Sequence, residues 1–258
     1  MAGVLVSRTT YADAVNSLIQ AARARVPLVA AATSVHGLTL AAIDPEFGAV
    51  LNSFELVTPD GQPVRWALNV LHGAGLSERV YGPTLMRQLC ETAAAEGVSV
   101  YFYGSRPEVL DGLVERLRAS IPGLRIAGWS APPFRPLTPE EDAQEVEAII
   151  ASDAQLVFVG LGCPRQERWA YQHRPRLARP LVCVGAAFDF HAGTLRQAPA
   201  WMQSRGLEWS FRLVMEPRRL WRRYAKHIPI FVALVARQYF TQRMSSFTLS
   251  PPRRKENN

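Results

Sequence analysis

The sequence predicts an α/β protein with a Rossmann-like parallel sheet, helices on both faces of that sheet and a helical appendage at the C-terminal end. Two observations predict the sheet: short apolar runs of strand length recur along the chain, and longer segments of helical period separate them. Strands that alternate with helices form parallel sheets. A third observation predicts the appendage, because strand-like runs stop after Pro199 while helical segments continue.

The elements follow in order along the chain. Strands are expected over residues 28–32, 54–57, 98–103, 124–129, 156–159 and 181–184. Helices are expected over residues 10–25, 62–71, 84–96, 108–119 and 139–151. A further helix is expected after the first strand and ends at about residue 43. Pro27 and Gly97 each end a helix. Thr138 and Glu141 form a capping box around Pro139, which favours a helix start there.

The C-terminal segment differs from the rest in composition. From Arg205 onward there are twelve basic and three acidic residues, so this segment carries +9 and the residues before it carry −2. Aromatic residues and arginines interleave from Trp201 to Tyr224, and a short apolar helix is expected over 228–235. We therefore expect three parts: an α/β domain (1–198), a basic amphipathic helical appendage (199–245) and a disordered tail (246–258). The appendage has the composition of a segment that lies on a membrane surface, with five apolar residues at helical spacing available to enter it: Ile228, Phe231, Leu234, Val235 and Tyr239. A helix that merely packs on the core is the alternative.

Composition excludes several classes of protein. Hydrophobic residues make up 48% and charged residues 20% of the 258 residues, which is typical of a globular chain. No run approaches the roughly 20 apolar residues that cross a bilayer, and the N-terminus does not resemble a secretory leader. The three cysteines, Cys90, Cys163 and Cys183, lack the spacing of a zinc site or a disulfide framework. We expect a reducing compartment and no bound metal.

One stretch, from Leu156 to Trp169, organises the candidate site. A buried strand ends at Gly160 and Gly162, and a helix follows Pro164. Unpaired N–H groups and the helix dipole then point at one place, which is the arrangement of an anion site; an ordinary strand-to-helix connection is the alternative. In parallel sheets, ligands bind beyond the carboxyl ends of the strands. Thr33, Asp60, Gly104 and Gly162 all fall in loops at those ends.

The motifs that the chain lacks narrow the chemistry. It has no HExxH or DxD motif, no GxSxG elbow and no Walker loop, and the third glycine of the dinucleotide fingerprint is missing, so we expect no cofactor. Cys163 has no indicated partner as a nucleophile. An Asp-Gly pair such as Asp60-Gly61 is by itself typical of a turn. A carboxylate beside a diphosphate site nevertheless suits a general base that activates an acceptor hydroxyl, with arginines and helix N-termini stabilising a departing nucleoside diphosphate.

An ordered set of motifs completes the sequence-based interpretation. In chain order they are Pro59-Asp60-Gly61 with Trp66-Ala67, Arg79 to Gly82, Gly160 to Glu167, Phe188 to Gly193, Arg196 to Trp201, Gly206 to Trp209, and Glu216 to Leu220. With these motifs the chain resembles glycosyltransferase family 26, the WecG/TagA/CpsF-type transferases, from about residue 4 to 240. The resemblance implies an inverting, metal-independent transfer of a sugar from a UDP-sugar to a polyprenyl-diphosphate-linked sugar, during synthesis of a cell-surface or secreted polysaccharide.

The resemblance also assigns residues and partners. Asp60 matches the family's base, Thr33, Arg79, Gln166 and Asp189 match donor-site positions, and Arg212 and Arg219 match appendage arginines that close over the donor diphosphate. Gly104 and Gly162 complete the expected substrate-binding rim. The family often has Asn two residues after the threonine, where this chain has Val35 followed by His36. His36 therefore either takes over that role or is structural.

The implied partners are a UDP-sugar donor, a lipid-linked sugar acceptor and an anionic membrane surface, with no nucleic acid. The implied location is the cytoplasmic face of the membrane, where the protein would be peripheral. The residues leave open the transferred sugar, the acceptor, the linkage and the oligomeric state. A non-enzymatic basic module that binds RNA or anionic membrane through residues 205–258 is the alternative; it explains the charged tail but gives Asp60 no role.

Overall fold

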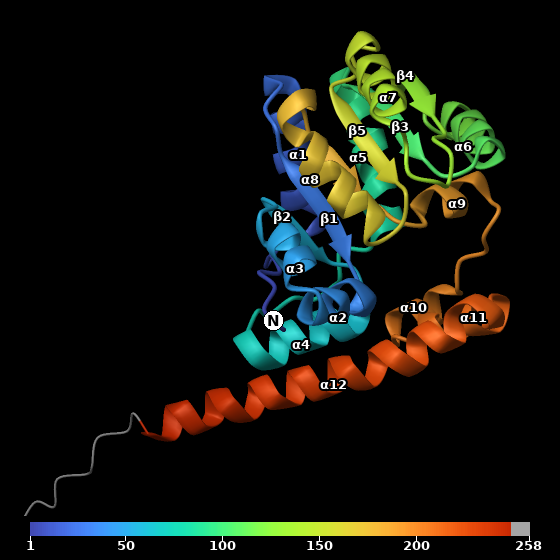
Figure 1. Cartoon of the computed structure of the whole chain (residues 1–258). Helices are drawn as coiled ribbons and strands as arrows, with labels where there is room; N and C mark the ends of the chain where they lie inside the picture. Colours follow the sequence, from blue (N-terminus) through green and yellow to red (C-terminus); the bar gives the residue numbers. More distant parts are fainter. Residues whose placement is uncertain (249–258) are drawn as a thin grey trace, which may run out of the picture.

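A six-stranded, all-parallel sheet forms the centre of the molecule, and the computed structural model describes residues 1–248 (Figure 1). Its strands are β1 (Val29–Thr33), β2 (Leu56–Pro59), β3 (Ser99–Gly104), β4 (Arg125–Ser130), β5 (Leu156–Gly160) and β6 (Leu181–Cys183). They pair in the order β2-β1-β6-β5-β3-β4. The predicted parallel α/β sheet is confirmed.

Helices cover both faces of the sheet, because successive strand residues point into two separate cores. One core receives Val100, Phe102 and Phe158, and the other receives Tyr101, Val157 and their alternating neighbours. The first core is closed by α1 (Tyr11–Ala24), α5 (Gly82–Glu96), α6 (Pro107–Ser120) and α9 (Ala187–Ala192). The second is closed by α2 (Val35–Ile43), α3 (Pro45–Asn52), α4 (Gln62–His72), α7 (Pro139–Ala151) and α8 (Arg165–Leu177).

Helix starts follow the local sequence. The Thr138 hydroxyl accepts the backbone N–H of Glu141, and the Glu141 carboxylate accepts the N–H of Thr138, which confirms the predicted capping box of α7. Thr10 and Asp13 make the same reciprocal pair at the start of α1. Both boxes supply partners to N–H groups that the first helical turn leaves unpaired.

Three helices follow the sheet: α10 (Ala200–Ser204), α11 (Glu208–Met215) and α12 (Pro217–Thr248). Figure 1 shows α12 passing beyond the carboxyl ends of the strands, beside α2 and α4. The prediction of a short helix over 228–235 is wrong, since α12 continues through Pro229 to Thr248. Residues 246–248 of the expected tail thus belong to α12, and the rest of that tail lies outside the described residues.

The apolar side of α12 faces the protein. Phe231 is only 6% exposed and joins the second core, and His227 is buried with its Nδ1 2.6 Å from the Thr39 hydroxyl of α2. Gln238 accepts a hydrogen bond from the Ala2 N–H at 3.3 Å. Phe231 therefore packs on the core, whereas the sequence suggested that it enters a membrane. Among residues 1–248, no helix combines the length and the apolarity that crossing a bilayer requires.

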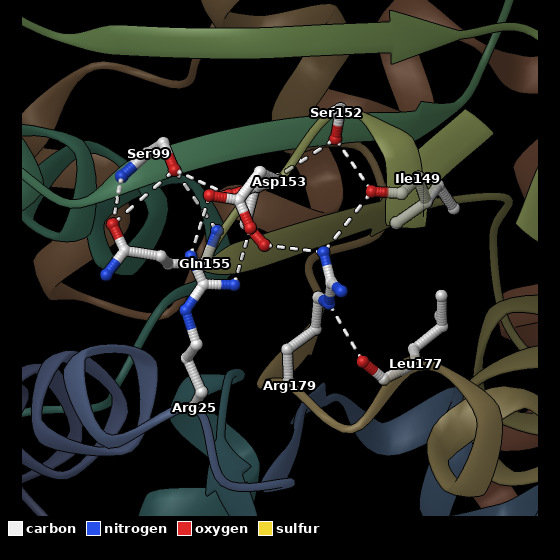
Figure 2. A network of polar contacts seen from close by, with 9 residues as sticks. Arg25, Ser99, Ile149, Ser152, Asp153, Gln155, Leu177 and Arg179 are labelled. Atoms are coloured by element: carbon white, nitrogen blue, oxygen red, sulfur yellow. Dashed lines mark hydrogen bonds and ion pairs between the residues drawn. The ribbon is translucent and has the colours of Figure 1, made fainter. Parts of the chain in front are cut away.

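A buried polar network fixes the opposite, amino-terminal edge of the sheet (Figure 2). Arg179 donates to the carbonyls of Ala154, Ile149 and Leu177 at 2.6, 3.2 and 2.8 Å. Beside it, Ser99 of β3 and Gln155 exchange backbone and side-chain hydrogen bonds. These bonds join the strand starts of β3 and β5 to the end of α7 and to the segment before β6.

Candidate active site

A groove of about 840 Å³ lies beyond the carboxyl end of β2, between α4 and the C-terminal helices. Its polar end is lined by Ser34, His36, Asp60, Arg79, Tyr81, Glu208, Arg212 and Arg223. Its apolar end is lined by Trp66, Val70, Ile228, Val232, Val235, Tyr239 and Phe240, among others. The groove thus places one charged cluster next to a long apolar surface.

Asp60 lies at the polar end because β2 stops one residue before it. Its backbone N–H donates to the Thr33 carbonyl at the end of β1, at 3.2 Å. Its Oδ1 accepts the N–H of Gly82, the first residue of α5, at 3.1 Å. Burial raises the pKa of the Asp60 carboxyl to about 6, and Glu208 adds to the rise while Arg79 and the Gly82 N–H oppose it. A carboxyl with this pKa is suited to take a proton near neutral pH.

Arg79 and Glu208 form an ion pair beside Asp60, and both side chains are nearly buried. Burial opposes the charge of Arg79, but the carboxylates of Glu208 and Asp60 outweigh it and hold the pKa of Arg79 above its usual value. The Arg79 guanidinium lies 4.2 Å from the centroid of the Tyr81 ring. Burial, reinforced by Glu208, raises the pKa of the Tyr81 hydroxyl, which therefore stays protonated.

Two further arginines reach the groove from the C-terminal helices. Arg212 of α11 lies 5.5 Å from the centroid of the Phe190 ring and 3.5 Å from the carboxylate of Glu216. Arg223 of α12 has a buried Nε for which the described residues offer no hydrogen-bond partner. Burial lowers the pKa of Arg223, with Arg212 among the charges that add to this effect. An incompletely paired guanidinium in a cleft is a ready partner for a phosphate group.

His36 lines the same end of the groove, with its ring 4.5 Å from the ring of His227 in an edge-to-face arrangement. Its Nδ1 is buried and finds no hydrogen-bond partner within the described part of the chain. Burial, together with the positive charge of Arg223, lowers the pKa of His36 to about 3. The ring is therefore neutral at pH 7, and it can offer a hydrogen bond to a ligand without repelling the arginines.

Comparison with known proteins identifies the family to which the chain belongs. Residues 1–245 match the family described as "Glycosyl transferase WecG/TagA/CpsF family". The chain belongs to this family. It is similar to the N-acetylglucosaminyldiphosphoundecaprenol N-acetyl-beta-D-mannosaminyltransferase of Bacillus spizizenii (strain ATCC 23059 / NRRL B-14472 / W23), with 34% identity over 194 residues, 74% of this chain and 72% of the relative. The protein of the same name in Bacillus subtilis (strain 168) is 29% identical over 196 residues, 76% of this chain and 73% of the relative. The chain is a glycosyltransferase, so the interpretation as a non-enzymatic basic module is set aside.

The groove of this glycosyltransferase unites four of the predicted site residues: His36, Asp60, Arg79 and Arg212. They come from α2, the loop after β2, the loop before α5, and α11. The resemblance named all four, but the residues alone pointed only to Asp60. No periodicity in the sequence predicts that these segments meet.

Other predicted residues lie at the carboxyl edge of the sheet but do not line this groove. The buried Thr33 hydroxyl donates to the Ala31 carbonyl at 3.3 Å, and the buried Gln166 side chain accepts the N–H of Gly185 at 3.1 Å. Gly104 has a positive φ of 114°, and a Cβ there would lie 2.7 Å from the Gly160 carbonyl carbon. The close approach of two backbones explains this glycine. Gly162 follows β5 and accepts the N–H of Gln166 at 2.9 Å.

Asp189 and Arg219 do not line the groove either. Asp189 of α9 is 4.0 Å from Arg106. Arg219 is 59% exposed and pairs with Glu216 at 2.7 Å. Arg212 and Arg219 would share a helical face only on a continuous helix, and the chain breaks between α11 and α12 at Glu216. Glu216 instead pairs with both arginines.

Several groove residues were given no role from the sequence, among them Tyr81, Glu208, Arg223 and His227. Tyr81 and Glu208 stand inside two of the quoted motifs, so their positions were marked although their function was not. Arg223 and His227 were hidden among the many basic residues of the appendage. Their one available signal was helical spacing, which places them one turn apart on α12.

Two further possibilities concern Cys163 as a nucleophile and a group of side chains as metal ligands. Burial, with the neighbouring Glu167 carboxyl, raises the pKa of the Cys163 thiol well above its usual value, which disfavours a nucleophilic thiolate. Among residues 1–248, no group of three or more His, Cys, Asp or Glu side chains is arranged to hold a metal ion.

Proposed function

We propose that this glycosyltransferase moves a sugar from a UDP-sugar to a polyprenyl-diphosphate-linked sugar, with inversion at the anomeric carbon. The observation that carries the proposal is the Asp60 carboxyl, whose pKa is raised to about 6 in a groove that also holds Arg79, Arg212 and Arg223. A base of this kind beside several arginines fits a reaction in which a hydroxyl loses a proton and a diphosphate departs.

The proposed step uses Asp60 as general base. The Asp60 carboxylate takes the proton of the acceptor hydroxyl while that oxygen attacks the anomeric carbon of the donor sugar. The new glycosidic C–O bond forms as the bond between the anomeric carbon and the UDP oxygen breaks, so the electron pair leaves with UDP. Attack opposite the leaving group inverts the configuration, and no covalent sugar–enzyme intermediate is required.

The departing diphosphate gains negative charge, which the arginines would stabilise. Arg212 lines the groove and provides planar N–H donors suited to phosphate oxygens. We propose the family-matched residues Thr33, Arg79, Gln166, Asp189 and Arg219, with Gly104 and Gly162 at the rim, as further parts of the donor site. The missing DxD motif supports a reaction without a metal ion.

The acceptor class follows from the two Bacillus relatives, whose names specify N-acetylglucosaminyldiphosphoundecaprenol as the acceptor. We carry over the lipid-linked diphosphate sugar as the acceptor class. The transferred sugar is not carried over, because His36 stands near the place where the family often has Asn. Since its Nδ1 has no hydrogen-bond partner among the described residues, the neutral His36 ring is a candidate for recognising the donor sugar.

We place the protein on the cytoplasmic face of the membrane as a peripheral protein. Arg218, Arg222, Lys226 and Arg237 are exposed on α12 and fall on one side of it at the helical repeat. None of them lines the groove. This group, called the basic stripe below, would bind anionic headgroups at about 1 kcal/mol per residue.

Transfer assays with Asp60→Asn test the proposed function. We expect the wild-type protein to release UDP from a UDP-sugar only when a lipid-linked acceptor is present. Asp60→Asn should still bind UDP-sugar but turn over about 10²–10⁴-fold more slowly, as is typical after loss of a general base. Asp111→Asn, on the exposed side of α6, is the matched control and should be fully active. Near-normal turnover by folded Asp60→Asn would remove Asp60 from the mechanism.

A further inference from the structure

The apolar end of the groove has no role in the chemistry at Asp60, yet both ends belong to one continuous cavity. Trp66 lies at the junction. Its ring packs against the backbone of Gly206, where a Cβ would lie 2.6 Å from Trp66 Cη2. This contact brings the loop before α11 directly onto α4, so that the polar cluster and the apolar surface share a wall.

The apolar end is formed by two helices that face each other. From α4 come Trp66, Ala67 and Val70, and from α12 come Ile228, Val232, Val235, Ala236, Tyr239 and Phe240. Val232 is 59% and Val70 63% exposed, so no side chain of the described residues covers this surface and it is open to a ligand. From Arg223 to Phe240 the wall formed by α12 is about 25 Å long at about 1.5 Å per residue.

The order of chemistry along the groove matches one kind of molecule. Arg223 of α12 suits the diphosphate of the acceptor, because its buried Nε has no partner among the described residues and the apolar wall of α12 begins after it, while Arg79 and Arg212 are left for the donor. A diphosphate joined directly to a long hydrocarbon chain places its charge and its chain in this same order. The residues of the basic stripe do not line the groove, so the apolar surface is open to a ligand other than the headgroups that the stripe is proposed to bind.

We propose that the groove between α4 and α12 binds the first isoprenoid units of the lipid-linked acceptor, and that the enzyme thus recognises the chain as well as the sugar and the diphosphate. This inference rests on the proposed function for the identity of the acceptor. The chain would lie between Val70 and Val232, and its diphosphate would lie at Arg223. Acceptors that share the sugar and the diphosphate would then be distinguished by the length of their chain.

Direct binding in water tests the inference without requiring turnover. Farnesyl diphosphate and inorganic diphosphate are titrated into the full-length protein, with no detergent or vesicles, and followed by calorimetry. We expect farnesyl diphosphate to bind at least about tenfold more tightly, because its chain buries apolar surface. Equal affinities for the two probes would overturn the proposal.

A matched pair of variants on α12 locates the binding site. Ala236 lines the groove, and Ala233 is exposed on the same helix outside it. Ala236→Trp should fill the groove, so that farnesyl diphosphate binds no more tightly than inorganic diphosphate. Ala233→Trp should keep the higher affinity for farnesyl diphosphate. Unchanged farnesyl binding by folded Ala236→Trp would refute the site.

Binding to phospholipid vesicles separates this proposal from a membrane-inserting face. The added indole of Ala236→Trp would strengthen vesicle binding if the groove face entered the bilayer, and that result with unchanged farnesyl binding would overturn the proposal. A protein that transfers sugar equally well to acceptors with five-carbon and fifteen-carbon chains would retain the proposed function and refute this inference. A protein that binds farnesyl diphosphate in a way that Ala236→Trp abolishes, but that transfers no sugar, would refute the proposed function and leave the proposed groove intact.

Discussion

Arg79 and Glu208 are 129 positions apart in the sequence, and they form an ion pair beside the candidate base. The pair links the loop before α5 to the first residue of α11. Glu208 also raises the pKa of Asp60, whereas Arg79 lowers it. The ion pair thus keeps a positive charge close to Asp60 while compensating much of its effect.

The first prediction concerns the pH dependence of turnover. The kcat/KM of the wild-type protein should fall as the pH drops below about 6, since Asp60 must be deprotonated to act as a base. Glu208→Gln removes a negative charge that raises the pKa of Asp60, so this acid limb should move to lower pH by roughly half to one unit. Kinetics from pH 5 to 8 measure the shift. Glu115→Gln, on the exposed side of α6, should leave the profile in place, and an upward shift in Glu208→Gln would contradict the assignment.

The second prediction concerns stability. The pKa of Asp60 is about 6 in the folded protein, whereas the ordinary value of 3.8 applies in the unfolded chain. Between pH 3.8 and pH 6 the folded state therefore binds more protons than the unfolded state. The contribution of Asp60 to stability is therefore present below about pH 4 and is lost as the pH rises through 6. Asp60→Asn, which cannot ionise, should have a higher free energy of unfolding than wild type at pH 8, by roughly 1–3 kcal/mol. Urea unfolding at pH 8 and pH 4.5 measures this. The difference should shrink at the lower pH; a variant that is less stable at pH 8 would contradict the raised pKa.

The third prediction separates the two family-matched arginines of the appendage. Arg212 lines the groove and Arg219 is 59% exposed outside it. Arg212→Ala should lower kcat/KM by about 10–100-fold, as expected for the loss of a charged hydrogen bond. Arg219→Ala should lower it by a smaller factor, about threefold to tenfold, because Arg219 lies at the exposed margin of the proposed donor site and is linked to Arg212 through their shared partner Glu216. Both variants should bind anionic vesicles nearly as wild type does. Equal losses of turnover would mean that α12 moves to bring Arg219 into the groove during the reaction.

The fourth prediction concerns metal ions. The chain lacks a DxD motif, and three arginines already line the groove in which the diphosphate is proposed to leave. Excess EDTA should therefore leave the rate of transfer essentially unchanged. Assays with and without EDTA, followed by added Mg²⁺ or Mn²⁺, check this. Loss of activity with EDTA and recovery with either metal would show that a cation, rather than arginine, stabilises the leaving group.

The fifth prediction concerns the basic stripe. Neutralising Arg222 and Lys226 together, each to Gln, should weaken binding to anionic vesicles by about 2 kcal/mol, or roughly 30-fold. Co-sedimentation with vesicles at low and moderate salt measures the change. Arg116→Gln with Arg118→Gln, on α6, removes the same charge elsewhere and should have little effect. Equal weakening by both pairs would indicate a response to net charge alone.

The sheet could be predicted from the sequence because most of its strands, the edge strand β4 excepted, are buried on both faces. Such strands leave short, continuous apolar runs, and Val157 and Phe158 belong to one of them although they point into opposite cores. Asp60 could be found for a related reason, since it stands in the polar turn that follows the strand expected over 54–57, and such a turn marks the carboxyl end of a strand. The identity of its neighbours came only from the family resemblance.

Long-range pairings could not be predicted. The carbonyl partners of Arg179 come from three different segments, and no spacing in the chain indicates them. The length of α12 was missed for a local reason, because Pro229 predicts a helix end. In the structure, Pro229 and Ala225, one turn before it, are both exposed, so water can bond the carbonyl that Pro229 leaves without a donor.

The position of α12 has a consequence for how this enzyme can be altered. The same helix supplies one wall of the groove and carries the basic stripe, so the two proposed tasks, binding a ligand and binding the membrane, fall to one element. A protein in which α12 is exchanged for an unrelated membrane anchor would reach the membrane and still lack half of its binding groove. If the proposed membrane binding holds, anchoring and chemistry are not interchangeable modules in this chain, and substitutions in α12 that tune one task are constrained by the other.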